Sequence, residues 1–142
     1  MIRIVLPAAA IVLMAVAGYL YTADRRAPVP AAGASGAPIV QVTLPAELSE
    51  AAMTGQTIFD AACASCHGAN AAGQDGVAPP LVHIIYEPGH HGDEAFQRAV
   101  AQGVQAHHWP FGDMAAVAGL TRADVAMVVA YVRELQQANG IR

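Results

Sequence analysis

The chain has 142 residues, which is enough for one domain with an appendage. Its seven basic residues, all arginines, are outnumbered by eleven acidic ones, and the formal net charge of −4 excludes the basic surface of a nucleic-acid-binding protein. Only two cysteines are present, so no disulfide framework replaces a hydrophobic core.

An uncharged stretch near the N-terminus, residues 4–21, precedes Asp24-Arg25-Arg26. At ~1.5 Å per residue it spans about 27 Å, close to the ~30 Å thickness of bilayer hydrocarbon. We therefore expect residues 1–26 to form a transmembrane anchor. The alternative is a signal peptide cleaved near Ala17, where Ala15-Val16-Ala17 supplies the small-x-small pattern.

The next segment, residues 27–38, consists almost entirely of Ala, Pro, Gly and Ser. Such a segment buries too little apolar surface to offset the entropy lost on ordering it. We predict a flexible linker over residues 27–44 and one folded domain over residues 45–142.

The folded domain is expected to begin with a helix from about residue 49 or 54 to residue 64. Its expected buried stripe consists of Met53, Ile58, Phe59 and Ala62. Gly55 is unfavourable in a helix by about 1 kcal/mol relative to alanine, which indicates a close crossing with a second helix.

This helix leads into Cys63-Ala64-Ser65-Cys66-His67. Two thiols at this spacing can each form a thioether to a porphyrin, while the adjacent imidazole binds the iron. A thioredoxin-like motif expects a βαβ setting that the chain does not offer, and a zinc site lacks the usual downstream histidine pair. A disulfide between the two cysteines would close only a tiny loop. The pentapeptide therefore predicts a c-type haem site held by Cys63, Cys66 and His67.

The residues after the motif, 68–78, are rich in glycine and predict a loop, which ends at Pro79-Pro80-Leu81. A metal-bound histidine usually donates its second N–H to a fixed acceptor, and a carbonyl of this rigid segment suits that role.

Two further helices are expected downstream. Asp93 can cap a short one over residues 94–102, with Phe96, Ala99 and Val100 inward and Gly103 as its stop. A longer helix follows Thr121, which forms a capping box with Asp124, and it ends at Asn139-Gly140. Its apolar face consists of Val125, Val128, Val129, Val132 and Leu135.

Between these helices, residues 107–114 form a loop rich in aromatic residues and end at Met114. A thioether sulfur is a soft ligand for haem iron, and a loop position can aim it at a cofactor. We predict Met114 as the sixth ligand, with His107 or His108 as rivals. Met53 and Met127 lie within helical stripes and are expected to fill the core.

Together these features resemble a class I c-type cytochrome over residues 45–142. The resemblance implies an all-α fold in which three to four helices wrap around one covalently bound haem c, preceded here by the membrane helix and the linker. It also implies that Gly55 packs against Tyr131 where the first and last helices cross. The Pro79 carbonyl would accept a hydrogen bond from His67.

The same resemblance implies a one-electron carrier and not an enzyme, with both axial positions of the iron filled. The expected cofactor-binding residues are Cys63, Cys66, His67, Met114, Pro79, Phe59, Leu81 and Trp109, of which His67 and Met114 bind the metal. Trp109 and one histidine of the 107–108 pair are candidates to hydrogen-bond a haem propionate.

The arrangement of a membrane anchor, a flexible linker and one such domain also resembles that of the membrane-anchored cytochromes c of proteobacteria. The expected partners are redox proteins at the membrane: a quinol-oxidising complex, an oxidase, a reductase or a photosynthetic reaction centre. The expected location is the inner membrane with the haem domain in the periplasm, or the soluble periplasm if the anchor is cleaved.

Two alternative functions stay open at this point. The histidines outside the motif, which could gather copper or zinc in a metal-binding protein, are His83, His90, His91, His107 and His108. The second alternative is a haem sensor or a peroxidase-like enzyme in which the sixth coordination position of the iron stays open.

Overall fold

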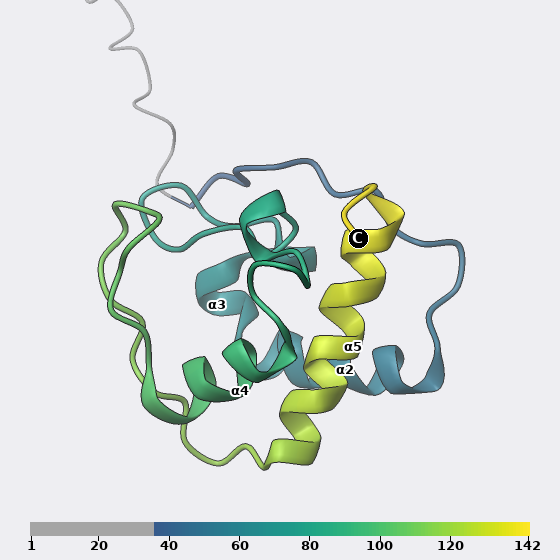
Figure 1. The fold of residues 1–142 in the computed structure, drawn as a ribbon. Coiled ribbons are helices and arrows are strands. Elements are labelled where there is room, and N and C mark those ends of the chain that lie inside the picture. The colour runs from purple at the N-terminus through teal and green to yellow at the C-terminus, as the bar shows by residue number, and fades with distance from the viewer. Residues whose placement is uncertain (1–35) are drawn as a thin grey trace, which may run out of the picture. The chain divides into compact units, whose positions relative to one another are not determined.

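A computed structural model describes residues 36–142 (Figure 1). The expected anchor over residues 1–26 and the first half of the expected linker, residues 27–35, lie outside these residues. Within the described range, no helix is both long and apolar enough to cross a bilayer. The elements are α2 (Glu50–Ala62), α3 (Ala64–His67), the short 3₁₀ turns η1 (Ala69–Ala71) and η2 (Ile84–Tyr86), α4 (Asp93–Gln102) and α5 (Arg122–Ala138). The described part of the chain is therefore helical, as expected, with two isolated β-bridges in place of any sheet.

Helix α2 begins at a polar N-cap that also ties it to α5. The Ser49 hydroxyl accepts a hydrogen bond from the backbone N–H of Ala52 and donates one to Glu134 of α5 at 2.6 Å. A capping serine satisfies a backbone donor that the first turn of a helix leaves unpaired. The same side chain thereby fixes the start of α2 against its neighbour.

The buried face of α2 differs from the predicted stripe. Ala52, Gly55 and Phe59 are the buried residues, whereas Ile58 and Ala62 are half-buried and Met53 is 51% exposed. The prediction for Met53 was wrong because the stripe is centred on the glycine. Residues 52, 55 and 59 share one helical face, and position 53 is rotated about 100° away from position 52.

Helix α5 forms as predicted. Thr121 and Asp124 make the expected capping box, and the helix ends at Asn139. All five residues of the predicted apolar face are buried. Figure 1 shows α5 lying across α2, with α4 beside it. The core of the domain is thus the contact between the first and last long helices.

Gly55 lies where α2 and α5 cross. A β-carbon at this position would overlap the backbone carbonyl of Met127. The prediction of a close crossing is confirmed, but Gly55 meets the backbone of Met127 and Val128 where we expected Tyr131. Tyr131, one turn further along α5, packs its ring on Phe59 with centroids 5.6 Å apart.

Helix α4 starts one residue earlier than predicted, and its N-cap is Gly92, with no side-chain capping bond. Asp93 was expected to be the cap. Its carboxylate instead accepts a hydrogen bond from Arg133 Nε on α5 at 2.9 Å, so the side chain is engaged across the helix interface. The predicted stop is correct, because Gly103 is the C-cap.

The chain between α4 and α5 makes a long excursion, visible at the left of Figure 1. Val104 and Met114 pair through two backbone hydrogen bonds of 2.9 Å, which closes the intervening residues into a hairpin-like loop. Gly103 has a positive φ of 76°, and a β-carbon there would overlap the Met114 carbonyl. Glycine is therefore required where this loop leaves α4.

The crossing at Gly55 makes a direct prediction about stability. Gly55→Ala is expected to lower the free energy of unfolding by about 2 kcal/mol, because overlap with backbone atoms outweighs the ~1 kcal/mol gain in helix propensity. Chemical denaturation measures the change. Gly89→Ala is the matched control, since a β-carbon at Gly89 meets no atom within 4 Å. An unchanged midpoint for Gly55→Ala would contradict the close packing of α2 on α5.

Candidate functional site

A cavity of about 700 Å³ opens between the helices and the two long loops. Its lining comes from the end of α2, from α3, from residues 77–81, from α4 and from residues 104–118. Most of these side chains are apolar. All eight residues that the sequence predicted to bind a cofactor line this one cavity: Phe59, Cys63, Cys66, His67, Pro79, Leu81, Trp109 and Met114.

The cysteine motif lies where α2 gives way to α3. Cys63 is the C-cap of α2 and the N-cap of α3, and Cys66 lies in the single turn of α3. No disulfide joins them. Burial, and secondarily the neighbouring Cys66, raises the pKa of the Cys63 thiol. The two sulfurs are thus presented on one short turn at the cavity wall, which is the arrangement that two thioether bonds to one porphyrin require.

His67 follows on the same turn, and its ring is held by a backbone carbonyl. The His67 Nδ1 lies 2.9 Å from the Pro79 oxygen, so the expected hydrogen bond is present. Because a carbonyl only accepts, Nδ1 carries the proton and Nε2 keeps its lone pair. Burial lowers the pKa of His67, an effect that the Pro79 hydrogen bond partly opposes. The imidazole is therefore neutral and oriented, as a metal ligand must be.

Gln74 fixes the turn that carries the motif. Its Nε2 lies within hydrogen-bond distance of three successive carbonyls, those of Ala64, Ser65 and Cys66, at 3.2, 2.8 and 3.1 Å. The Ala64 carbonyl also accepts from the Gly68 N–H, whereas the carbonyls of Ser65 and Cys66 lie at the end of the helix, where no further turn satisfies them. Sequence reasoning placed Gln74 in a loop and missed this role, since a glutamine in a glycine-rich stretch carries no local signal for it.

Met114 reaches the same cavity from the loop between α4 and α5. Its side chain is half-buried, and the backbone bridge to Val104 holds its position in the loop. The structure therefore brings Met114 and His67 together although 46 residues separate them in the sequence. Met53, by contrast, is exposed on α2 and does not line the cavity.

Trp109 lines the cavity with one polar atom unsatisfied. Its ring stacks on Phe111 with centroids 5.8 Å apart and meets His83 edge-on at 5.2 Å. Within residues 36–142 the buried Nε1 has no hydrogen-bond partner in good geometry, although it lies near enough to Tyr86 to oppose in part the rise that burial causes in the pKa of that hydroxyl. An unpaired buried donor costs about 1–3 kcal/mol, so this atom indicates a missing acceptor.

Two polar residues of α5 hold the loop over residues 81–91, and sequence reasoning missed both roles. Arg133 donates to the carbonyls of Tyr86 and His91 at 2.7 and 2.6 Å. Gln136, which is almost fully buried, donates to the carbonyls of Leu81 and Tyr86 at 2.8 and 2.9 Å. A polar residue on an otherwise apolar helical face was the available signal for Gln136.

The cytochrome c family model matches residues 52–136, which is more than half of the chain. The chain belongs to the cytochrome c family. No curated protein and no solved structure gives a significant match to it. The resemblance to class I c-type cytochromes is thus confirmed, and with it one covalently bound haem c with its iron. Membership of this family indicates haem-based electron transfer.

The cavity of this cytochrome fits a haem on its own chemistry. Two thiols and an oriented neutral imidazole lie on one wall, a thioether sulfur lines the same space, and the rest of the lining is largely apolar. The unpaired Nε1 of Trp109 provides a donor for a carboxylate such as a propionate.

The hydrogen bonds made by Gln74 lead to a prediction about the stability of this cytochrome. Gln74→Leu is expected to lower the free energy of unfolding of the haem-loaded protein by about 1–3 kcal/mol, because carbonyls at the end of α3 lose their donor. Gln97→Leu is the control, since Gln97 makes a single exposed hydrogen bond to the Arg122 carbonyl. Equal losses for both variants in chemical denaturation would contradict a special role for Gln74.

Proposed function

We propose that this cytochrome is a one-electron carrier in which Cys63 and Cys66 hold the haem covalently and His67 and Met114 are its axial ligands. One observation carries the proposal: His67, with its Nε2 lone pair free, lines the same cavity as Met114, and the two come from separate elements. The bound haem supplies the exchange of one electron between ferric and ferrous iron.

The protein's residues set the conditions for that exchange. Phe59 is fully buried beside Tyr131, and Leu81 and Phe96 are half-buried against the core. An apolar surrounding disfavours the more highly charged oxidised state, and so does a neutral thioether ligand. These residues therefore favour a raised reduction potential.

Two protein ligands on the iron leave no position for a substrate, which supports a carrier and not an enzyme. A sensor or a peroxidase-like enzyme requires that the sixth position stay open. The identity of the sixth ligand therefore separates these functions.

Met114→Ala is expected to remove the sulfur-to-iron charge-transfer band at the red end of the ferric absorption spectrum. The reduction potential should fall by on the order of 0.1 V, a fraction of the ~0.8 V range over which axial ligands set haem potentials. Absorption spectroscopy and redox titration of the haem-loaded protein measure the two changes.

Met53→Ala is the control for this experiment, because Met53 is exposed on α2 and does not line the cavity. It should leave the band and the potential unchanged. Retention of the band in Met114→Ala would exclude Met114 as the ligand. Absence of the band from the unaltered protein would favour an open sixth position or ligation by His107 or His108.

The partners that suit such a carrier are redox proteins at the membrane: a quinol-oxidising complex, an oxidase, a reductase or a reaction centre. The uncharged segment over residues 4–21 supports an inner-membrane anchor with the haem domain in the periplasm. Cleavage near Ala17 would instead yield a soluble periplasmic carrier.

Charge limits how this domain meets a partner. Residues 45–142 carry four arginines, no lysine and ten carboxylates, which gives a formal net charge of −6 with neutral histidines. A ring of lysines around the haem edge is therefore absent from the sequence itself. Docking relies on apolar contacts near the edge or on a basic partner.

The net negative charge of the domain predicts that salt changes the rate of electron transfer in opposite directions for cationic and anionic redox reagents. Electron transfer to a cationic metal complex should slow several-fold as ionic strength rises from about 0.01 to 0.15 M, where the Debye length shrinks from ~30 to ~8 Å. Transfer to an anionic complex should speed up. Stopped-flow absorption measures both rates. A negligible salt effect with both reagents would show instead that the exposed edge lies outside the negative field.

A further inference from the structure

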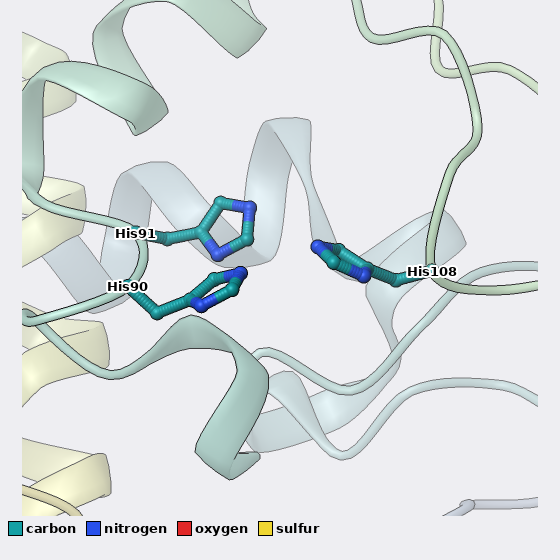
Figure 2. A group of neighbouring side chains, drawn as sticks. All are labelled: His90, His91 and His108. Carbon is teal, nitrogen blue, oxygen red and sulfur yellow. The ribbon is translucent and has the colours of Figure 1, made fainter.

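Four of the histidines gather on two loops at the edge of the haem cavity. His90 and His91 lie between η2 and α4, and His107 and His108 lie in the excursion between α4 and α5. Figure 2 shows His90 and His91 on one loop with their rings facing that of His108 on the other. One ligating nitrogen from each of these three residues lies within 4.8 Å of the other two. His83, which packs on Trp109, takes no part in this group.

His91 is held in a metal-binding tautomer by the backbone. Its Nδ1 lies 2.6 Å from the Ile85 carbonyl, which accepts only, so Nδ1 is protonated and Nε2 keeps a lone pair. A carbonyl behind a histidine is the usual support of a metal-bound imidazole. The His91 backbone is fixed as well, because its N–H donates to the Glu87 carbonyl and its own carbonyl accepts from Arg133.

The second loop is anchored in a comparable way. The Asp113 carboxylate accepts a hydrogen bond from the Ala106 N–H at 2.8 Å, and the backbone bridge between Val104 and Met114 closes the loop. His107 hydrogen-bonds the Gln105 carbonyl through Nδ1 at 2.8 Å, and its ring centroid lies 4.2 Å from that of His108. Backbone contacts therefore hold both loops where their imidazoles meet.

The neighbouring side chains oppose protonation of His108. Partial desolvation, followed by the charges that His107, His91 and His90 would carry, lowers the pKa of the exposed His108 ring. Neutral imidazoles are the form that binds metal ions. The metal-binding cluster contains no carboxylate. Protonating several of its imidazoles would place like charges side by side, which is unfavourable, whereas a metal ion can bind them in the neutral form.

The donor set limits the kind of ion. Zinc binds imidazole nitrogen at about 2.0–2.1 Å, so the ligands of a tetrahedral ion lie about 3.3 Å apart. Since the nitrogens lie within 4.8 Å of one another, each separation has to close by at most about 1.5 Å, which side-chain rotation of the two exposed residues, His90 and His108, provides. An all-nitrogen set suits zinc or copper and does not suit magnesium or calcium, which prefer oxygen.

We propose that His90, His91 and His108 form a second metal site, separate from the haem iron, that binds one Zn²⁺-type divalent cation through three imidazole nitrogens. His91 and His108 also line the haem cavity, so the cation would lie at its edge. A positive charge there favours the reduced iron. The site thus links occupancy by a second metal to the haem potential.

The test uses the haem-loaded protein prepared without a histidine tag. Zn²⁺ is titrated in competition with a chromogenic chelator, and the expected result is one ion per chain. His90→Asn, His91→Asn and His108→Asn should each weaken binding by at least ~100-fold, the upper range for losing the support of a metal-bound histidine. His83→Asn removes one histidine outside the group and is expected to leave the affinity unchanged. An unchanged helical circular dichroism spectrum shows that each variant is folded.

Two further measurements complete the test. Cu²⁺ in place of Zn²⁺ should show nitrogen hyperfine splitting in its paramagnetic resonance spectrum, and Zn²⁺ should shift the haem potential upward in the unaltered protein but not in His91→Asn. Absence of stoichiometric binding, or equal weakening by His83→Asn, would overturn the proposal. Loss of the sulfur-to-iron band in His108→Asn would also overturn it, because that histidine would then serve the haem site.

Discussion

The close crossing of α2 and α5 is the constraint on which the rest of the structure depends. Gly55 lets the two backbones approach so closely that a β-carbon at this position would overlap the Met127 carbonyl of α5. This contact fixes the end of α2, and therefore the turn that carries Cys63 and His67. It also fixes the direction of α5, whose Arg133 and Gln136 hold the loop over residues 81–91. One helix contact thus positions both the turn that carries the cysteine motif and this loop of the cavity wall.

Helix α5 combines two roles on one surface. Its valines and Leu135 pack into the core, while Arg133 and Gln136 bind carbonyls of the loop over residues 81–91. Buried polar side chains are costly unless every group is paired, and here the donors meet backbone carbonyls or, for Arg133 Nε, the carboxylate of Asp93. That loop carries Leu81, which lines the haem cavity, and His91, which belongs to the proposed second metal site. A change in α5 therefore affects both sites.

Local rules predicted the elements whose signals lie close together in the sequence. The capping box of Thr121 and Asp124 and the glycine that ends α4 depend on residues within a few positions of one another, and both formed as expected. Local rules did not predict which face of α2 is buried, because that depends on where α5 packs against it. Met53 is consequently exposed, and Asp93 serves an ion pair with Arg133 and does not cap its helix.

The sequence by itself determined the expected chemistry of the haem site, since the spacing of Cys63, Cys66 and His67 is that of two thioether bonds and an adjacent iron ligand. It also supplied Met114, the proposed sixth ligand, and Pro79, whose carbonyl holds the His67 ring. Only the tertiary structure decided which distant residues share a cavity and which histidines gather. The physical reason is that ligand spacing within one turn is set by covalent geometry, whereas the meeting of two loops is set by helix packing and by long-range hydrogen bonds such as those of Arg133.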